Sequence, residues 1–382
     1  MTQESTPSSA TLPDRINGKR ILVTGACGTV GESLIRQLLE STTSRPTQVV
    51  GFDNAESPLF FADQKWLQDP RASFRLGDVR DRDAMVEVMK GIDVVFHTAA
   101  LKHVILCERS PYEAVQTNIL GVNNVIHAAQ ANNPEIVIFT SSDKAVNPTN
   151  VMGTSKLMGE RLMTAANAND RDCSTIFAST RFGNVLGSNG SVIPIFRKQI
   201  IGGGPVTLTH PEMTRFVMSI DEAVRLVIES SAFARGGEVF ITKMPVIRIE
   251  DLAQVMIDEL ALAYARDHRS IKIEIIGSKP GEKLYEELMS DEETRRAVEL
   301  KDYFSVLPAF RGIYGEIDYD YPGVVSTTVT NPYVSSSESC LSRAELRQFL
   351  LSNHLLDESG TNETGSLRYW PGDKEKLATE QA

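Results

Sequence analysis

The sequence predicts an α/β fold, in which a doubly wound parallel sheet carries helices on both faces and a smaller region follows it. From Lys19 onward, short β-rich runs alternate with longer segments whose apolar residues recur at helical spacing. The β-rich runs are almost continuously apolar, which is typical of strands that are covered on both faces. Such an alternation joins parallel strands through helical crossovers.

Five strands are expected in the first half of the chain, in the order RILVTG, QVVGFD, SFRLGDV, DVVFHTAA and EIVIFTSS. GESLIRQLLES follows the first run and EAVQTNILGVNNVIHAAQAN precedes the fifth, and both have helical periodicity. After Gly187 the rhythm loosens into a helix, SVIPIFRKQII, a turn, GGGP, and further short elements. We therefore divide the chain into a flexible leader (1–18), a first domain (19–187), a smaller region packed on it (188–352) and a polar tail (353–382).

The composition limits the class of protein. At 382 residues the chain is long enough for roughly two units of about 100 to 200 residues. Its 41% hydrophobic and 23% charged residues are ordinary for a folded globular protein. The net charge of -11 disfavours nucleic acid and anionic membranes as partners. No apolar run reaches the roughly 18 residues that span a bilayer, and the leader lacks the apolar segment of a signal peptide, so we expect a cytoplasmic protein.

The four cysteines, Cys27, Cys107, Cys173 and Cys340, lie far apart and form no CxxC pair. This spacing favours reduced thiols that mostly fill the core over a disulfide framework or a zinc site. We expect no bound metal.

A glycine-rich turn follows the first predicted strand. RILVT runs into the segment Gly25, Ala26, Cys27, Gly28, Thr29, Val30 and Gly31, where a predicted helix begins. Glycines at this spacing allow a tight turn, a close approach of the backbone to a pyrophosphate, and close packing of the helix, whose N-terminus faces the negative charge. Because the motif lies on the first strand of a doubly wound pattern, it predicts a Rossmann dinucleotide-binding site.

Two carboxylates end the next two predicted strands. Asp53 lies 22 positions after Gly31, where it is placed to accept hydrogen bonds from both hydroxyls of the adenosine ribose. A 2'-phosphate would meet like charge at Asp53, so NAD is favoured over NADP. Asp78 is expected at the adenine edge, with the N-cap of the following helix as the alternative.

Further motifs follow in the order HTAALKHV (97–104), TNILGVNNVI (117–126), SSDKAVNPTNVMGTSK, RFGNVLGSNGSVIPIF, MTRFVMS and PGEKLYEEL. With the glycine turn they resemble the bacterial UDP-N-acetylglucosamine 4,6-dehydratases of polysaccharide biosynthesis, which are extended short-chain dehydrogenases. The resemblance covers roughly residues 19 to 350, and it is to the soluble short form of a family whose long members carry transmembrane helices. It implies a lyase that uses NAD, binds a UDP-sugar mainly through region 188–352, and forms a homo-oligomer, a dimer or higher.

The implied reaction requires three proton movements. Hydride transfer from C4 to NAD creates a ketone and acidifies the C5 proton; a base removes this proton while an acid assists departure of the C6 hydroxyl, and hydride returns to C6. The resemblance implies that Lys144 is the C5 base and Asp143 the C6 acid, and Ser142 would bond the 4-hydroxyl. A working base requires a depressed pKa of Lys144, which we expect from burial and from the positive charges of the nicotinamide and Lys156.

One position departs from the Tyr-x-x-x-Lys signature of short-chain dehydrogenases. The tyrosine is replaced by Met152, four residues before Lys156. A thioether cannot take a proton from a substrate hydroxyl, so Asp143 becomes the candidate for receiving the 4-hydroxyl proton as well. Some members of the family resemble this chain in carrying Met here. Lys156 would hold the nicotinamide ribose.

The resemblance also implies ligand contacts. Asn184, Arg215 and Glu282 would hold the UDP part, because an amide and a guanidinium suit phosphate oxygens and a carboxylate suits ribose hydroxyls. Arg181 is a further phosphate candidate, with a pair to an acidic neighbour as its alternative. On the sugar side we expect Lys102, Val192 and His103, the last with a structural role as its alternative. The other cofactor contacts expected are Val79, Ala99, Ala100, Lys102 and Asn118.

Two other functions stay open at this point. A UDP-sugar C4 epimerase needs the same cofactor but no elimination, and it relies on the tyrosine that is absent here. A non-catalytic NAD-binding protein is compatible with Met152. Retention and inversion at C5 are not distinguished, since both use the same residues. The stretch 314–339, rich in Tyr, Val, Ser, Thr and Pro, is expected to be an irregular wrap or an oligomer contact.

We predict that the chain binds NAD more tightly than NADP, because Asp53 would repel a 2'-phosphate. Titration of the protein with both dinucleotides measures this preference. Equal or tighter binding of NADP would contradict the role assigned to Asp53.

Overall fold

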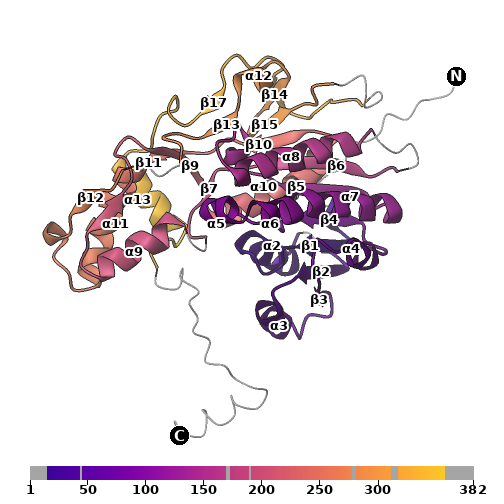
Figure 1. Ribbon diagram of the computed structural model, residues 1–382, viewed down its shortest axis with the longest axis horizontal. Coiled ribbons are helices and arrows are strands. Elements are labelled where there is room, and N and C mark those ends of the chain that lie inside the picture. The colour runs from indigo at the N-terminus through magenta and orange to yellow at the C-terminus, as the bar shows by residue number, and fades with distance from the viewer. Residues whose placement is uncertain are drawn as a thin grey trace, which may run out of the picture.

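The computed structural model describes residues 15–43, 45–168, 173–188, 191–277, 281–310 and 317–357. Most of the expected leader and of the expected polar tail lies outside these ranges. Figure 1 shows a large sheet flanked by helices, with a second group of helices and short strands at one end of it.

The large sheet has ten strands in the order β16-β14-β15-β10-β6-β5-β4-β1-β2-β3. In chain order they are β1 (Arg20–Thr24), β2 (Gln48–Asp53), β3 (Ala72–Leu76), β4 (Val94–His97), β5 (Ile136–Thr140), β6 (Ile176–Arg181), β10 (Val239–Thr242), β14 (Ala297–Leu300), β15 (Tyr303–Val306) and β16 (Val324–Ser326). Seven neighbouring strands pair in parallel, in the order β10-β6-β5-β4-β1-β2-β3. Strands β15, β14 and β16 continue the sheet beyond β10 with antiparallel pairing. The doubly wound parallel sheet and its five expected strands are confirmed.

Helices cover both faces of this sheet. The first face carries α2 (Thr29–Glu40) and α10 (Ile220–Phe233), and the second α4 (Arg82–Val88), α7 (Gly121–Asn132) and α8 (Val151–Ala166). On β1, Ile21 and Val23 belong to the first core and Leu22 to the second, because successive side chains of a strand point to opposite faces. This explains why the strands are apolar throughout. Among the described residues, no helix combines the length and the apolar composition needed to cross a membrane.

Shorter helical segments lie in the connections between the strands of the sheet. They are α3 (Glu56–Lys65), α5 (Val104–Arg109), α6 (Pro111–Val115) and a π-helical turn (Gln116–Leu120) that leads into α7.

The second group of elements has its own core. It contains α9 (Val192–Ile201), α11 (Ile249–Ala263) and α13 (Arg343–Ser352), with a three-stranded sheet of β7 (Asn184–Val185), β9 (Thr214–Met218) and β11 (Val246–Arg248), and a pair of β8 (Val206–Leu208) and β12 (Ile273–Ile275). Phe196, Met256 and Leu346, one from each helix, are buried together. This group faces the carboxyl ends of the parallel strands, where a ligand would lie.

The chain after residue 187 does not form a separate body. Strands β10, β14, β15 and β16 come from the region 188–352 but extend the large sheet. Within the stretch 314–339, the described part begins at 317, contributes β16, and pairs β17 (Tyr333–Val334) with β13 (Glu287–Met289). Tyr321 is buried there and bonds Glu238 and Ser305. The described part of this stretch therefore wraps onto the sheet.

All four cysteines are free thiols. Cys107 is buried, whereas Cys27, Cys173 and Cys340 are partly exposed. Core filling therefore describes Cys107 fully and the other three only in part.

Candidate active site

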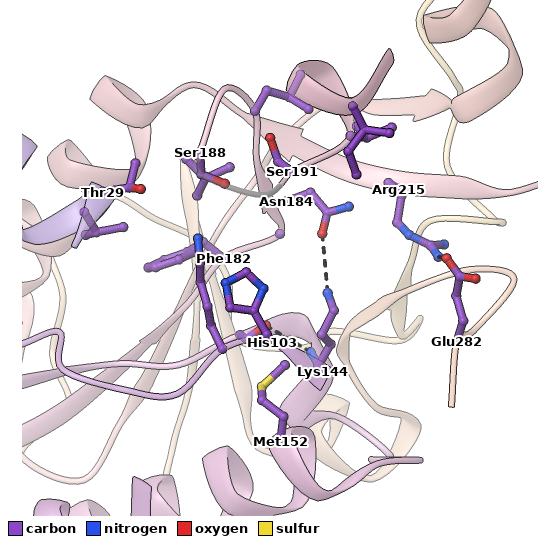
Figure 2. A pocket seen from close by; sticks show the side chains of 18 of the residues that line it. Thr29, His103, Lys144, Met152, Phe182, Asn184, Ser188, Ser191, Arg215 and Glu282 are labelled. Atoms are coloured by element: carbon purple, nitrogen blue, oxygen red, sulfur yellow. Dashed lines mark hydrogen bonds and ion pairs between the residues drawn. The ribbon is translucent and has the colours of Figure 1, made fainter. Parts of the chain in front are cut away.

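A cavity of about 680 Å³ lies at the carboxyl ends of the parallel strands. Its walls come from the glycine turn, from the segments after β4 and β5, and from the second group of elements; they include Gly28, Thr29, Val30, Gly31, Ala100, Lys102, His103, Ser142, Lys144, Met152, Lys156, Asn184, Val192, Arg215 and Glu282. Figure 2 shows His103, Lys144 and Met152 close together, with Arg215 and Glu282 farther along the same cavity. The structure thus brings most of the expected site residues to one place.

The glycine turn has the geometry that a bound pyrophosphate requires. Gly25 has a φ of 71°, and a Cβ there would lie 2.6 Å from the backbone nitrogen of Ala99. A Cβ on Gly31 would lie 2.1 Å from the carbonyl oxygen of Gly25, so only glycine lets α2 begin this close to the turn. The N-terminus of α2, at Thr29, borders the cavity. These residues therefore fit the phosphates of a dinucleotide.

Asp53 lies directly beside the glycine turn. Its Oδ2 accepts a hydrogen bond from the backbone N–H of Cys27 and its Oδ1 from that of Ala55, each at 2.9 Å. Each carboxylate oxygen has a further lone pair with which it can accept a hydrogen bond from a ribose hydroxyl. The geometry is compatible with the role expected for Asp53.

Asp78 and Val79 do not lie among the residues that line the cavity. Asp78 forms an ion pair with Arg80 at 2.6 Å and accepts a hydrogen bond from Asn54. The hydrogen bond from Arg80 is the main cause that lowers the pKa of Asp78 to about 2. The N-cap of α4 is Asp81, so the N-cap alternative for Asp78 is wrong. Val79 is buried in the second core.

Asn118 supports the cavity wall without lining it. Its Oδ1 accepts from the backbone N–H of Leu101 at 2.8 Å, and its Nδ2 donates to the carbonyl of Leu101 at 3.0 Å and to Ser155 Oγ at 2.9 Å. The side chain is 1% exposed. Asn118 therefore holds the segment that carries Ala100 and Lys102, and the cofactor contact expected for it stays a prediction. Burial lowers the pKa of Lys102.

Lys156 and Met152 lie on the first turns of α8 and line the cavity. Lys156 Nζ donates to the carbonyl of Thr140 at 2.9 Å and lies 4.7 Å from the centre of the Phe139 ring. Burial is the main cause that lowers its pKa to about 8. Met152 is almost fully buried and packs with Cys107. Met152 therefore contributes apolar surface where the dehydrogenase signature has a phenol.

The turn after β5 brings Ser142, Asp143 and Lys144 into mutual contact. Ser142 Oγ donates to Asp143 Oδ1 at 2.6 Å, and the same oxygen lies 3.0 Å from Lys144 Nζ. Ser142 and Lys144 line the cavity, whereas Asp143 is 1% exposed and does not. Asp143 can therefore exchange a proton with a bound molecule through the Ser142 hydroxyl.

The expected depression of the Lys144 pKa is wrong for this structure. Removal from water alone would lower the pKa, but the carboxylates of Asp143 and Glu286 outweigh that effect and raise it. Glu286 Oε1 lies 3.6 Å from Lys144 Nζ. Without a ligand, Lys144 is therefore an ammonium ion, and it must lose a proton before it can act as a base.

Glu286 was not expected at the site from the sequence. It precedes β13 directly, is 3% exposed, and contacts Arg215 as well as Lys144. The motif PGEKLYEEL contains three carboxylates, and only Glu282 was selected from it. Adjacent residues of an extended chain point to opposite sides, which is a signal that Glu286 and Glu287 differ in their surroundings. In the structure Glu286 contacts Lys144 and Arg215, whereas Glu287 bonds Asn147.

Asn184, Arg215 and Glu282 form the far end of the cavity. Asn184 Oδ1 accepts from Lys144 Nζ at 3.4 Å, as the dashed line in Figure 2 marks. The Arg215 guanidinium donates to the carbonyls of Thr214, Lys283 and Leu284 at 2.7, 2.8 and 3.2 Å, and lies 3.9 Å from Glu282. Arg215, on β9, is thus held in place by a carbonyl of its own strand and by two carbonyls of the segment before β13 while it borders the cavity.

Arg181 does not line the cavity, and the alternative given for it holds. It is 1% exposed and forms bidentate pairs with Glu160, at 2.8 and 2.6 Å, and with Glu293, at 2.9 and 2.8 Å. Although burial opposes the charged form, both carboxylates raise the pKa of Arg181. Its guanidinium ties β6 to α8 and to α12 (Asp291–Thr294). Arg181 is a structural residue.

Comparison with known proteins gives a match to one family over most of the chain. The family model described as polysaccharide biosynthesis protein matches residues 21–308. The "uncharacterized membrane protein MJ1061" of Methanocaldococcus jannaschii is 49% identical over 290 residues, 76% of this chain and 86% of that protein. The probable polysaccharide biosynthesis protein EpsC of Bacillus subtilis is 42% identical over 75% of this chain but only 48% of its own length. The UDP-glucose 4-epimerase of Rickettsia bellii is 37% identical over 90% of this chain and 98% of that protein.

Solved structures share the fold. Pen from Bacillus thuringiensis has a TM-score of 0.81 and 40% identity, and the match covers 89% of this chain and 99% of Pen. DesIV from Streptomyces venezuelae, a dTDP-glucose 4,6-dehydratase with NAD bound, has a TM-score of 0.61 and 22% identity over 69% of this chain and 86% of DesIV. The second likeness concerns the fold alone.

We predict that Arg181→Met lowers the free energy of unfolding by about 3 to 5 kcal/mol, because it removes the cation that pairs with two buried carboxylates, Glu160 and Glu293. Chemical denaturation measures this change. Arg343→Met, which breaks an exposed pair with Asp251, is the control and should cost less than about 1 kcal/mol. Unchanged stability of the Arg181 variant with a raised KM would instead indicate phosphate binding.

Proposed function

The chain belongs to the polysaccharide biosynthesis protein family, and from this premise we propose that it is an NAD-dependent UDP-N-acetylglucosamine 4,6-dehydratase. It is a nucleotide-sugar-modifying enzyme of the extended short-chain dehydrogenase superfamily. The proposal adds the substrate and the reaction, in which a UDP-4-keto-6-deoxy sugar and one water are formed.

The observation that carries the proposal is the cluster of Ser142, Asp143 and Lys144, in which Ser142 and Lys144 line the cavity together with Met152 and Asp143 lies buried behind them. An elimination needs a base and an acid at neighbouring carbon atoms, and this turn supplies an amine and a carboxyl within 3.0 Å of each other. An epimerase of this superfamily needs a phenol that takes and returns one proton. The thioether of Met152 cannot do so.

The cofactor of the proposed reaction is NAD. The glycine turn would hold its pyrophosphate, Asp53 its adenosine ribose, and Lys156 its nicotinamide ribose. When bound, NAD takes a hydride from C4 of the sugar and returns it to C6.

The protons are moved by side chains of this chain. The 4-hydroxyl proton passes through the Ser142 hydroxyl to Asp143 as the C4 hydride leaves. Lys144, once neutral, takes the C5 proton, and Asp143 returns its own proton through Ser142 to the departing C6 hydroxyl, which leaves as water. Lys144 then gives its proton back to C5 as hydride reaches C6. The protons therefore balance over the whole reaction, and one water is the only group that the sugar loses.

Epimerisation at C4 is the second candidate. It is favoured by the relative from Rickettsia bellii, which is named a UDP-glucose 4-epimerase and which this chain matches over 98% of its length. An epimerase would leave the mass of the nucleotide sugar unchanged.

Incubation of the protein with NAD and UDP-N-acetylglucosamine, followed by mass spectrometry, tests the proposal. We expect a nucleotide sugar that is lighter by one water. A product of unchanged mass with inverted C4 would indicate the epimerase, and unchanged substrate would leave a non-catalytic NAD-binding protein.

We predict that Lys144→Ala abolishes water loss but leaves NAD binding largely intact, because Lys144 acts on the sugar and not on the dinucleotide. Mass spectrometry follows water loss, and titration follows binding. Full residual turnover would mean that another group removes the C5 proton.

We further predict that Asp143→Asn lowers kcat at least about 100-fold, since an amide of the same size can neither take nor return a proton. Met152→Leu conserves volume and should cost little. Both kcat values are measured at saturating substrate. An Asp143→Asn variant with near wild-type kcat would rule out the proton route through Asp143.

A further inference from the structure

Glu286 is a buried carboxylate that the proposed reaction does not yet use. Its Oε1 lies 3.6 Å from both Lys144 Nζ and Arg215 Nε. Its Oε2 is buried and has no hydrogen-bond partner among the described residues. The residue is fixed through its backbone, because its N–H donates to Ser335 Oγ at 3.0 Å and its carbonyl accepts from the Ser335 N–H at 2.9 Å. The carboxylate is therefore held against Lys144 by the fold.

Two carboxylates thus flank the amine of Lys144, and their surroundings differ. Asp143 Oδ1 accepts hydrogen bonds from Ser142 Oγ, from the Lys144 N–H and from Lys144 Nζ, at 2.6, 2.9 and 3.0 Å. Each carboxylate has one buried oxygen without a partner among the described residues, Asp143 Oδ2 and Glu286 Oε2. The other oxygen of Glu286, however, has only ion-pair contacts at 3.6 Å, which are longer than hydrogen bonds. Paired groups whose surroundings differ in this way take different roles in proton transfer.

The charges around Glu286 support the same distinction. Burial raises the pKa of Glu286, the nearby Asp143 raises it further, and the cations Lys144, Arg215 and Lys283 only partly offset this. When water is excluded from the site, the desolvation free energy is lower for a neutral Lys144 amine beside a neutral Glu286 carboxyl than for the ammonium and the carboxylate 3.6 Å apart. A sugar nucleotide that fills the cavity and draws the Arg215 charge toward its diphosphate would favour the neutral pair further.

We propose that Glu286 is a positioning residue that acts through Lys144, by taking the proton that Lys144 must lose before it can accept the C5 proton of the sugar. The inference rests on the proposed function. The proton moves from Lys144 Nζ to a Glu286 oxygen, and it returns to Lys144 after the amine has given the C5 proton back. No proton is exchanged with water in this transfer, and Glu286 does not touch the sugar.

The pH profile of kcat distinguishes this role from others. In the wild type the proton is passed within the pair, so kcat should be flat across neutral pH and fall only in acid, where both groups are protonated. In Glu286→Gln the proton that Lys144 loses must go to water. The Asp143 carboxylate opposes this loss, because it raises the pKa of Lys144. We therefore expect kcat to fall at least about tenfold at neutral pH and to recover as the pH rises.

Glu287→Gln is the matched control, because Glu287 is the next residue and bonds Asn147, whereas the ion pairs of Lys144 within the described part of the chain are with Asp143 and Glu286. The pH profile of Glu287→Gln should match that of the wild type. NAD titration and thermal unfolding establish that each variant is folded. If Glu286→Gln does not fold, Glu286→Asp, which keeps a carboxylate, should retain the flat neutral profile with a reduced kcat.

A profile of Glu286→Gln that is lowered equally at all pH values, or shifted toward acid, would overturn the inference while leaving the proposed function intact. A neutral-pH fall that recovers in alkali in Glu286→Asp as well would also overturn it. If the wild type removes no water from UDP-N-acetylglucosamine, the proposed function and this inference both fail.

Discussion

The contact between Lys144 and two buried carboxylates is the interaction on which the candidate site depends. Asp143 and Glu286 keep the amine charged and fixed in the ligand-free chain. Arg215 balances the second carboxylate from the substrate side. An isolated charge at this depth would be strongly unfavourable, so none of these groups can be removed without disturbing the others. The same balance lets a proton move within the cluster when a ligand enters.

The fold holds this cluster together through close backbone contacts. A Cβ on Gly153 would lie 2.1 Å from the carbonyl oxygen of Lys144, so glycine is needed where α8 packs on the turn after β5 that carries Ser142, Asp143 and Lys144. The Asn150 side chain caps α8 by accepting from the Gly153 N–H at 2.8 Å. This start of α8 places Met152 and Lys156 on the cavity. One turn and one helix start therefore position both the proton-transfer groups and the lysine beside the proposed cofactor.

The sequence predicted what depends on local pattern, and it failed where distant residues meet. Strand order along the chain, the glycine turn and the cavity positions of Lys144 and Lys156 follow from periodicity and motifs. The pKa of Lys144 is raised by its sequence neighbour Asp143 and also by Glu286, which lies more than 140 residues away in the chain. The structural role of Arg181 depends on Glu160 and Glu293, which lie on α8 and α12. No local pattern reveals these distant partners. The contacts of the Asn118 amide with Leu101 and Ser155 likewise join three separate segments of the chain, so the sequence alone does not show them.

The central claim is that one cavity carries out oxidation at C4, elimination across C5 and C6, and reduction at C6. The most direct measurement uses UDP-N-acetylglucosamine that carries deuterium at C4 and locates the label in the product by NMR. The account predicts deuterium in the C6 methyl group, in a product lighter by one water. Deuterium retained at C4 of an epimer, or lost to solvent, would contradict it.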